Sequence, residues 1–358
     1  MASYDAIAGL PVEIDSVEFE GLELVLGDFE RLTTLIKLRG GGHEGIGEDV
    51  TYDAVDHVAQ QGHGPPADLT GTRSFDEFSQ LLEETDLFPT SAPEREDSRA
   101  YRRWAFESAA LDLALRQAGT NLAEAVGREA RPLTFVSSMR LTPFGSDEPS
   151  SIEPLLARLE HYPTLRFKLD PFNDWDDELI AALAETGAVD SLDLKGFYKG
   201  TPVDVETDPE LYAKLIETFP DAWLEDPDVT EETRPLLDAV SERVTWDAPI
   251  HSVADIEAMP WSPPKTVNVK PSRFGPISNL FATYDYCEQQ GIGAYGGGQT
   301  ELGPGRGQIQ YLASIFHPDT PNDVAPSGYN DPAQATKPGL PSSPLEPRLD
   351  ELGFRWVP

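Results

Sequence analysis

Cysteine, positive charge and long apolar runs are the features that this 358-residue sequence lacks or nearly lacks. Its single cysteine, Cys287, cannot form an internal disulfide, and the neighbouring Tyr286 and Glu288 provide no cation to activate its thiol. No apolar run approaches the ~20 residues of a membrane-spanning helix, and the first residues lack the basic flank and apolar core of a signal peptide. We therefore expect a soluble protein of a reducing compartment, the cytoplasm, with no membrane partner.

The shortage of positive charge excludes a second class of partner. The sequence has 27 lysines and arginines against 63 aspartates and glutamates, which gives a net charge of −36 and an isoelectric point near 4.3. Proteins bind phosphate backbones by neutralising them with cations, so nucleic acids and anionic membrane surfaces are not expected partners.

What the sequence does contain is enough apolar material for a large core. Apolar residues make up 39% and aromatic residues 9% of the chain, whereas disordered chains are poor in both. A length prior of about 150 residues per domain predicts two domains, or one barrel of about 250 residues with an appendage.

The first third of the chain predicts a small α+β domain. Apolar and acidic residues alternate along residues 12–19, and the apolar runs 22–26 and 32–38 follow, which is typical of an antiparallel sheet. Ser74 is a helix N-cap candidate, and residues 99–118 carry apolar residues at helical spacing.

The middle of the chain alternates between strand and helix patterns about eight times, which favours a closed parallel barrel. The predicted helices start at Asp174, Asp208, Thr230 and Ser278. The predicted strands are residues 133–137, 165–169, 189–194, 222–225, 243–247, 266–270, 292–295 and, more weakly supported, 312–316. We therefore divide the chain into an α+β domain (1–130), a (β/α) barrel (131–325) and a C-terminal segment (326–358) that packs back on the first domain.

Charged residues stand at the carboxyl ends of five consecutive predicted strands, about one βα unit apart. They are Lys168, Asp193, Glu225, Asp247 and Lys270. In a parallel barrel these ends open on one face, where active sites form. An acid or lysine buried at such a place is costly unless it is paired or ligated. Five of them in one phase therefore indicate a site.

The residue types suit one kind of chemistry. Asp193, Glu225 and Asp247 supply the oxygen ligands that Mg²⁺ prefers. A proton α to a carboxylate is very weakly acidic, so its removal needs a cation to neutralise the developing charge and a base held against the carbon. Lys168 and Lys270, on either side of the acids in strand order, are candidates for that base and its counterpart.

Taken together, these motifs resemble the enolase superfamily, and within it the muconate-lactonizing subgroup, along nearly the whole chain. The matching segments are residues 40–48, 107–127, 166–168, 267–275 and 297–303, together with the three acids. The resemblance implies a modified TIM barrel with an N-terminal α+β capping domain. It also implies Mg²⁺-assisted removal of an α proton by Lys168 and Lys270, with the three acids as metal ligands, which gives racemisation or epimerisation, dehydration of the succinylbenzoate-synthase type, or cycloisomerisation.

The sequence departs from that pattern at two cations. Arg166 stands where the subgroup has a lysine, so it keeps a positive charge that cannot titrate and is expected to tune Lys168. Lys195 stands two residues after Asp193, where relatives usually carry asparagine. It could bind a substrate anion, pair with Glu225 or Asp226, or weaken the metal site by repulsion.

Further residues are assigned to substrate binding or excluded from catalysis. Besides Arg166 and Lys195, we assign to the substrate Ser137, Gly297, Gly298 and Glu301. The glycines serve either close approach of the backbone to substrate or simple turn geometry. No His-Asp dyad stands near the sixth and seventh strands, which argues against the mandelate-racemase subgroup. His251 and His317 lie at loop positions, where a partly exposed, non-catalytic histidine is expected.

Two functional hypotheses follow. The first is a Mg²⁺-dependent lyase or isomerase that acts on a small carboxylate substrate, and the alternative is a non-catalytic metal- or ligand-binding barrel with a site altered by Lys195. The sequence does not name the substrate, and a homo-oligomer is one assembly that it allows. Since only three of the 63 acids are assigned to metal, most of the acidity must lie on the surface, as in a protein adapted to high salt.

Overall fold

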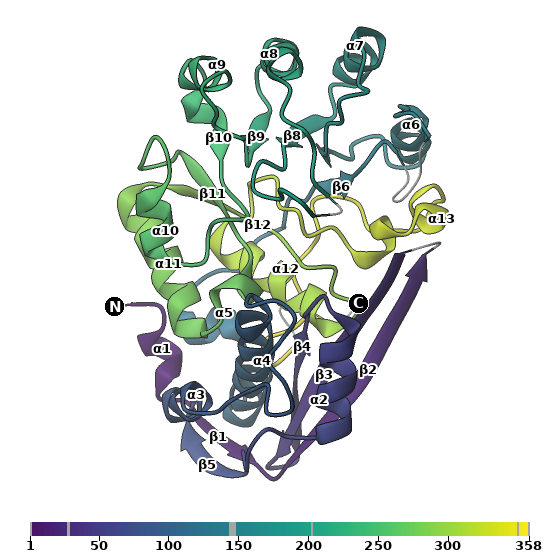
Figure 1. Cartoon of the computed structure of the whole chain (residues 1–358). Coiled ribbons are helices and arrows are strands. Elements are labelled where there is room, and N and C mark those ends of the chain that lie inside the picture. Colours follow the sequence, from purple (N-terminus) through teal and green to yellow (C-terminus); the bar gives the residue numbers. More distant parts are fainter. Residues whose placement is uncertain (1, 27–28, 143–147, 202, 349–350, 357–358) are drawn as a thin grey trace.

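Two kinds of sheet occupy opposite ends of the molecule, an antiparallel one in the N-terminal part and a parallel one in the middle of the chain (Figure 1). The computed structural model describes residues 2–26, 29–142, 148–201, 203–348 and 351–356. Within these residues, the helices are all too short or too polar to cross a membrane.

The N-terminal part, which we call the capping unit, is built on the alternating segments that the sequence shows. Its strands are β1 (Pro11–Ile14), β2 (Ser16–Leu26), β3 (Phe29–Gly40), β4 (His43–Asp49) and β5 (Gly71–Ser74). Strands β2, β3 and β4 form an antiparallel sheet, and β1 pairs with β5. The predicted small antiparallel sheet is confirmed, although the run 12–19 is divided at Asp15 between β1 and β2.

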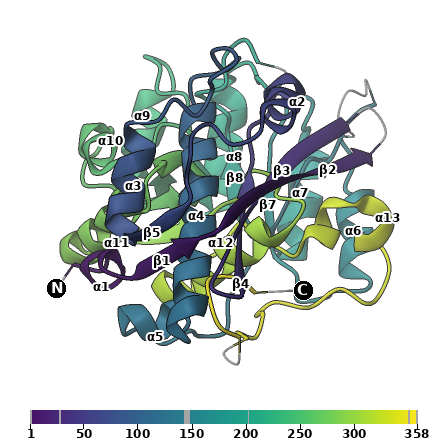
Figure 2. The same cartoon turned by 90° about the horizontal axis from the view of Figure 1, so that it is seen from below.

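The helices of the capping unit are α1 (Asp5–Ala8), α2 (Ala54–His63), α3 (Phe75–Glu83), α4 (Ser98–Ala118) and α5 (Leu122–Val126). Of these, α2 and α4 pack against the sheet of β2, β3 and β4 (Figure 2). Ser74 caps α3, because its hydroxyl accepts from the Glu77 amide at 3.2 Å while the Glu77 carboxylate accepts from the Ser74 amide at 2.7 Å. Strand β4 lies directly on α4, since a Cβ at Gly47 would come within 1.9 Å of the Ala105 carbonyl oxygen.

The parallel strands are arranged around the second part of the molecule. They are β6 (Ser137–Met139), β7 (Phe167–Leu169), β8 (Val189–Asp193), β9 (Trp223–Glu225), β10 (Val244–Thr245), β11 (Thr266–Val269) and β12 (Gly293–Gly296). Strands β6 to β10 form one sheet in chain order, and β11 pairs with β12. A backbone hydrogen bond links the two ladders, in which the Asn268 amide donates to the Trp246 carbonyl at 2.9 Å.

Residues 322–324 complete the other side of the ring. The Asp323 amide donates to the Gly296 carbonyl at 2.8 Å, and the Val136 amide donates to the Asn322 carbonyl at 2.8 Å. These bonds are parallel bridges from β12 to the chain just before β6. The predicted modified TIM barrel with a capping unit is therefore the fold of the chain.

Helices and turns surround the barrel strands, with α6 to α9 in an arc outside β6 to β10 (Figure 1). The helices are α6 (Glu153–Leu159), α7 (Asp177–Thr186), α8 (Pro209–Thr218), α9 (Arg234–Asp238), α10 (Val253–Ala258), α11 (Ile277–Gln290), α12 (Pro304–Phe316) and α13 (Pro332–Ala335). The 3₁₀ turns are η1 (Ser241–Arg243), η2 (Pro271–Phe274) and η3 (Ser327–Asn330).

Two strand predictions differ from the structure. Residues 312–316 are the end of α12, not a strand, and residues 322–324 take the eighth position of the ring instead. Nearly every residue of α12 is buried, and an apolar run that is buried on all sides does not show whether it is helix or strand. The first strand begins at Ser137, where the prediction for residues 133–137 ended.

The helix starts were predicted with mixed success. Asp208 caps α8 as expected, because its carboxylate accepts from the amides of Glu210 and Leu211. Helix α7 is capped by Asp176 rather than by Asp174. The Asp174 carboxylate instead accepts from the amide of Ser150, which lies in the connection between β6 and α6. Helix α9 begins at Arg234, later than predicted, but the Thr230 hydroxyl accepts from the amides of Glu232 and Thr233 in the turn that leads into it. Helix α11 begins at Ile277, one residue before the predicted Ser278.

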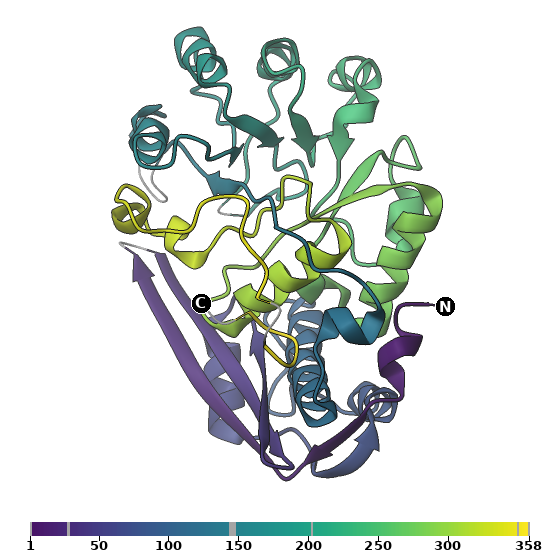
Figure 3. The same cartoon turned by 180° about the vertical axis from the view of Figure 1, so that it is seen from behind.

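The C-terminal segment returns to the capping unit (Figure 3). The Phe354 ring meets the Trp104 ring of α4 edge-on at 6.0 Å between centroids, and the Phe354 amide donates to Asp112 Oδ1 at 2.8 Å. On the way, the Leu133 amide donates to the Leu345 carbonyl at 2.9 Å. The segment thus contacts both α4 and the chain that leads into the barrel.

Candidate active site

Five charged side chains meet at the carboxyl ends of β7 to β11. Lys168 lies within β7, Asp193 and Glu225 end β8 and β9, and Asp247 and Lys270 follow β10 and β11. All five are buried. Parallel strands in a barrel bring their carboxyl ends to one face, so residues far apart in the sequence become neighbours there.

Lys168 is the centre of the acidic contacts. Its Nζ lies 3.1 Å from Asp193 Oδ2, 3.5 Å from Asp323 Oδ2 and in direct contact with Glu225 Oε1. Burial by itself would lower the pKa of Lys168, but the surrounding carboxylates hold it well above its ordinary value. Lys168 is therefore an ammonium group in this arrangement.

Asp247 is the partner of the second lysine. Lys270 Nζ lies 2.8 Å from Asp247 Oδ2, and Arg273 Nη1 lies 2.7 Å from Asp247 Oδ1. Burial would raise the pKa of Asp247, but these two cations hold it below its ordinary value. Arg273 also approaches the Tyr198 hydroxyl at 3.3 Å.

Sequence reasoning missed both Arg273 and Tyr198. Arg273 lies in the turn η2, which curls back immediately after Lys270; the proline that follows Lys270 was the available signal for that turn. Tyr198 lies in the long connection between β8 and α8, and no feature of the sequence marks it as a rim residue.

Glu225 and the neighbouring Asp226 are held differently. Burial raises the pKa of Glu225 well above its ordinary value although Lys168 opposes the shift, and Glu225 Oε2 accepts from the Tyr295 hydroxyl at 2.5 Å. The Asp226 carboxylate accepts from the amides of Asp247 and Ala248, each at 2.8 Å, and burial raises its pKa to about 7. Asp226 therefore orients the segment that carries Asp247.

Lys195 lies beside Asp193. Its Nζ is 2.5 Å from Asp193 Oδ2 and 3.3 Å from Asp170 Oδ1, so it pairs with these acids and not with Glu225 or Asp226 as considered from the sequence. Its backbone is left-handed, with φ of 56°. This turn at the end of β8 directs the side chain back toward the rim.

Two of the predicted substrate-binding residues lie apart from the cluster. The Arg166 side chain is partly exposed and pairs with Asp190, with Nε 2.9 Å from Oδ1. Arg166 stands just before the first residue of β7, and its pair with Asp190 sets it apart from Lys168, which it was expected to tune. Ser137 pairs with Phe167 while Ser138 pairs with Lys168, which places Ser138 on the lysine's side of the sheet.

The remaining predicted residues lie in the connection from β12 to α12. A Cβ at Gly297 would come within 2.6 Å of Lys270 Cε. The absence of a side chain at Gly297 therefore leaves space for the Lys270 side chain. A Cβ at Gly298 would likewise come within 2.5 Å of Glu301 Oε2. Glu301 Oε1 accepts from the Gln299 amide at 2.6 Å, and its Oε2 lies 2.9 Å from Arg306 Nη2, which makes it a tie within this connection.

The donor set suits a divalent cation by its chemistry. Asp193, Glu225 and Asp247 are oxygen donors from consecutive strands. The connected cluster has six acids and five cations; its members are Asp170, Asp193, Glu225, Asp226, Asp247, Asp323, Arg140, Lys168, Lys195, Lys270 and Arg273.

In this structure, lysines contact the carboxylates that we assign as metal ligands. Among the residues that the structure describes, no three acidic, histidine or cysteine side chains meet at one point as metal ligands would. Each of the three carboxylates contacts a lysine instead. A metal at these acids would therefore need at least one ammonium group to withdraw.

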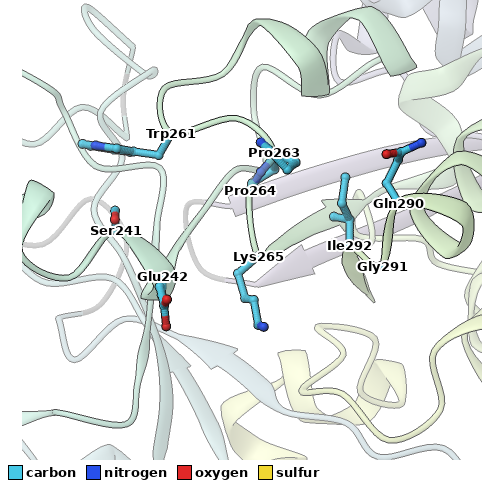
Figure 4. Close-up of a pocket in the computed structure, with 9 residues that line it drawn as sticks. All are labelled: Ser241, Glu242, Trp261, Pro263, Pro264, Lys265, Gln290, Gly291 and Ile292. Atoms are coloured by element: carbon cyan, nitrogen blue, oxygen red, sulfur yellow. The ribbon is translucent and has the colours of Figure 1, made fainter.

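A hollow of about 240 Å³ lies elsewhere, next to Lys265, Ile292 and Trp261 (Figure 4). Lys265 and Ile292 immediately precede β11 and β12, so this hollow lies at the amino ends of the strands, opposite the charged cluster. The buried charged side chains gather at the other end of the strands, so we do not consider this hollow the site.

Comparison with family models divides the chain in two. Residues 5–125 match a model described as the N-terminal domain of a domain of unknown function (DUF8230), and residues 129–331 match the corresponding C-terminal domain.

Two curated relatives share lower similarity. The chain is 28% identical over 232 residues to o-succinylbenzoate synthase of Bacillus subtilis (strain 168), covering 62% of this chain and 58% of that protein. It is 24% identical over 230 residues to o-succinylbenzoate synthase of Geobacillus stearothermophilus, covering 63% and 59%. The match thus spans less than two thirds of the length of either relative.

Solved structures share the fold over most of the chain. Dipeptide epimerase from Methylococcus capsulatus, complexed with Mg and the dipeptide L-Arg-D-Lys, is 19% identical with a TM-score of 0.65, covering 87% of this chain and 90% of that one. Muconate lactonizing enzyme from Pseudomonas putida is 16% identical with a TM-score of 0.60, covering 87% and 88%. The sequence motifs predicted the fold of the enolase superfamily, and the chain has that fold. By its family models, the chain belongs to the DUF8230 family.

Proposed function

We propose that the chain is a Mg²⁺-dependent lyase or isomerase that removes a proton α to the carboxylate of a small acid. One observation carries the proposal: two buried lysines and three buried carboxylates lie together at the ends of five consecutive barrel strands. The names of its relatives, a dehydrating synthase, an epimerase and a lactonizing enzyme, support this reaction class. The fold alone does not decide among the reactions.

The three acids are the proposed metal ligands. Asp193, Glu225 and Asp247 would hold the cation, which when bound would neutralise the negative charge that develops on the substrate carboxylate. Arg273 also fixes Asp247, since its Nη1 donates to Oδ1 at 2.7 Å and its Nη2 donates at 3.5 Å to Oδ2, the oxygen that Lys270 contacts. Asp226 fixes the same segment through its two backbone amides.

The two lysines are the proposed acid and base. Lys168 comes from β7 and Lys270 follows β11, so the acids on β8, β9 and β10 lie between them in strand order. If both exchange protons with the α-carbon, the outcome is racemisation or epimerisation. If Lys168 alone removes and returns the proton while Lys270 stays charged, the outcome is dehydration or cycloisomerisation.

The protonation states can be stated for the resting site. Asp193, Glu225 and Asp323 favour the ammonium form of Lys168, which is the form that donates a proton. Its basic form requires that these carboxylates lose part of their negative charge to another partner, because nearby opposite charge is what raises the lysine pKa. Lys168 can therefore act as a base only when the neighbouring carboxylates interact with a different positive charge.

The experiment is α-proton exchange in D₂O with MgCl₂, followed by NMR, with a set of small acids that includes dipeptides, muconate and o-succinylbenzoate-type acids. The expected result is deuterium at the α-carbon with the wild-type protein and none with Lys168→Met. Lys199→Met, which removes an exposed lysine of the β8–α8 connection, should exchange like the wild type. Absence of exchange with every acid, or equal exchange in Lys168→Met, would overturn the proposal.

The second candidate is a barrel that binds a metal or ligand without turnover. The contact of Lys195 with Asp193 favours it, because an ammonium group occupies one of the proposed ligands. Titration calorimetry with MgCl₂ separates the two: binding that is lost in Asp247→Asn, without exchange of any α proton, would favour this candidate.

A further inference from the structure

Two ammonium groups contact the single carboxylate of Asp193. Its Oδ2 is approached by two buried ammonium groups, Lys195 at 2.5 Å and Lys168 at 3.1 Å. Its Oδ1 accepts a long hydrogen bond, 3.3 Å, from the Lys195 amide. Lysines 168 and 195 therefore share one oxygen, although like charges at close range repel.

Lys195 has a second acid within reach that is incompletely used. Asp170 Oδ1 is buried and accepts no hydrogen bond from the residues that the structure describes, although it forms an ion pair with Lys195 Nζ at 3.3 Å. The other oxygen, Oδ2, pairs with Arg140 Nε at 3.2 Å. A buried carboxylate oxygen without a hydrogen-bond partner is unusual, so this oxygen can receive the Lys195 ammonium at no cost to an existing bond.

The backbone around Lys195 is fixed, so only the side chain has freedom to exchange partners. The Gly196 amide donates to the Asp226 carbonyl at 2.8 Å, and a Cβ at Gly196 would come within 2.5 Å of the Asp228 amide nitrogen. Lys195 itself is held at a positive φ that non-glycine residues rarely adopt. Strain of this kind concentrates at functional positions.

We propose, on the basis of the function proposed above, that Lys195 is a built-in competitor for the divalent cation. In the resting site its ammonium occupies Asp193, and when a divalent cation engages Asp193 the ammonium moves to Asp170 Oδ1. The lysine thereby keeps the acids neutralised without metal and raises the cation concentration that the site needs.

The test is titration calorimetry of the full chain with MgCl₂ at constant ionic strength, with MnCl₂ as a second probe. Lys195→Asn removes the competing charge, and asparagine tolerates the positive φ, so the backbone is preserved. We expect Mg²⁺ to bind Lys195→Asn about 10- to 100-fold more tightly than the wild type, the range typical of changes beside metal ligands. Lys199→Asn changes the net charge equally in the same connection and should leave the affinity unchanged.

A second variant tests the alternative position of the lysine. Asp170→Asn removes the acceptor for the displaced ammonium, so Mg²⁺ should bind several-fold more weakly than to the wild type. In the double variant with Lys195→Asn this loss should disappear, because no ammonium remains to be displaced. A loss of the same size in both backgrounds would mean that Asp170 acts only through its charge, and would overturn the exchange of partners.

The outcomes separate the two proposals. Equal or weaker Mg²⁺ binding in Lys195→Asn, with binding still abolished by Asp247→Asn, overturns the role of Lys195 and leaves the metal site intact. Absence of Mg²⁺ and Mn²⁺ binding in both the wild type and Lys195→Asn overturns the metal site, and the role of Lys195 with it.

Discussion

Buried acids are neutralised in two different ways in this molecule, by arginines in the capping unit and mainly by lysines at the barrel rim. In the capping unit, Asp49 pairs with Arg102 at 2.7 Å, with both side chains almost fully buried. At the rim, Asp193 is shared by Lys168 and Lys195. Arginine keeps its charge and makes a planar fork of hydrogen bonds, whereas lysine is a mobile point charge that can lose its proton.

In the Asp49–Arg102 pair of the capping unit, both carboxylate oxygens accept hydrogen bonds, so the pair is fixed in place. Asp49 Oδ1 accepts from the Thr51 amide at 3.0 Å and from its hydroxyl at 2.6 Å, while Oδ2 accepts from Arg102. The other Arg102 nitrogens donate to the carbonyls of Leu87 and Asp56 at 3.1 and 3.0 Å. The difference indicates that arginine pairs hold the capping unit together, whereas the rim lysines are placed for proton transfer and exchange of partners.

The largest expected effect is loss of proton exchange on changing Lys168. Lys168→Met keeps the length of the side chain and removes the ammonium, so the rate of α-proton exchange should fall by about 10²- to 10⁴-fold, the usual contribution of a general acid or base. The NMR assay in D₂O measures this rate, and thermal unfolding shows whether the variant is folded. A folded variant with an undiminished rate would show that the rim lysine is structural, like the capping arginines.

The next effect is on stability, and it concerns the capping unit. Arg102→Met leaves Asp49 buried without its cation, so the free energy of unfolding should fall by about 3–5 kcal/mol. Urea denaturation measures it. Arg99→Met is the matched control on the same helix, because its pairs with Asp86 and Glu96 are exposed and should contribute about 1 kcal/mol or less. Equal losses in the two variants would contradict the structural role of the buried pair.

A smaller effect is expected at His317, which is buried rather than partly exposed as its loop position suggested. Its Nδ1 lies 2.7 Å from Asn322 Oδ1, and burial lowers its pKa from about 6.5 to about 4. Since the unfolded chain takes up this proton first, the contribution to stability is present above pH 6.5 and is lost as the pH falls toward 4. Between pH 7 and 5 the loss should be about 2 kcal/mol.

The measurement is urea denaturation across that pH range, compared with His317→Gln. The variant should lose less stability between pH 7 and 5 than the wild type by the stated amount, whatever its absolute stability. If the two proteins lose stability in parallel, the histidine is not the group that titrates. Such a result would leave the paired acids as the source of the pH dependence.

The smallest effect concerns the surface. Because the net charge is −36 and the cluster at the rim accounts for little of it, the repulsion lies among exposed acids and should be screened by salt. Raising KCl from dilute buffer to molar concentration should increase the free energy of unfolding by an amount on the order of 1 kcal/mol, since surface potentials reach several kT. Stability that does not rise would contradict an adaptation to high salt.

Much of this architecture follows from local patterns in the sequence. The period of about one βα unit between Lys168, Asp193, Glu225, Asp247 and Lys270 predicted that they would share one face, and the structure brings all five together. The prediction succeeded because the strands are parallel, so residues at equivalent ends need no long-range information to be matched.

The failures occurred where neighbours, rather than local pattern, decide. Arg166, just before β7, pairs with Asp190 instead of lying beside Lys168, and pairing with β7 placed Ser138 instead of Ser137 beside Lys168. One-residue shifts of this kind reverse the face of a strand, and they depend on the partner strand.

By itself, the sequence determined the antiparallel capping sheet, the alternation of strands and helices up to β12 and the strand ends that carry charge, because periodicity and spacing are local properties. Only the tertiary structure decided which cation meets which acid: Lys195 with Asp193 and Asp170, and Arg273 with Asp247. Partner choice among buried charges depends on distances of a few ångströms between different strands and turns, because Coulomb energy in a buried site varies steeply at that range. No spacing along a single chain specifies those distances.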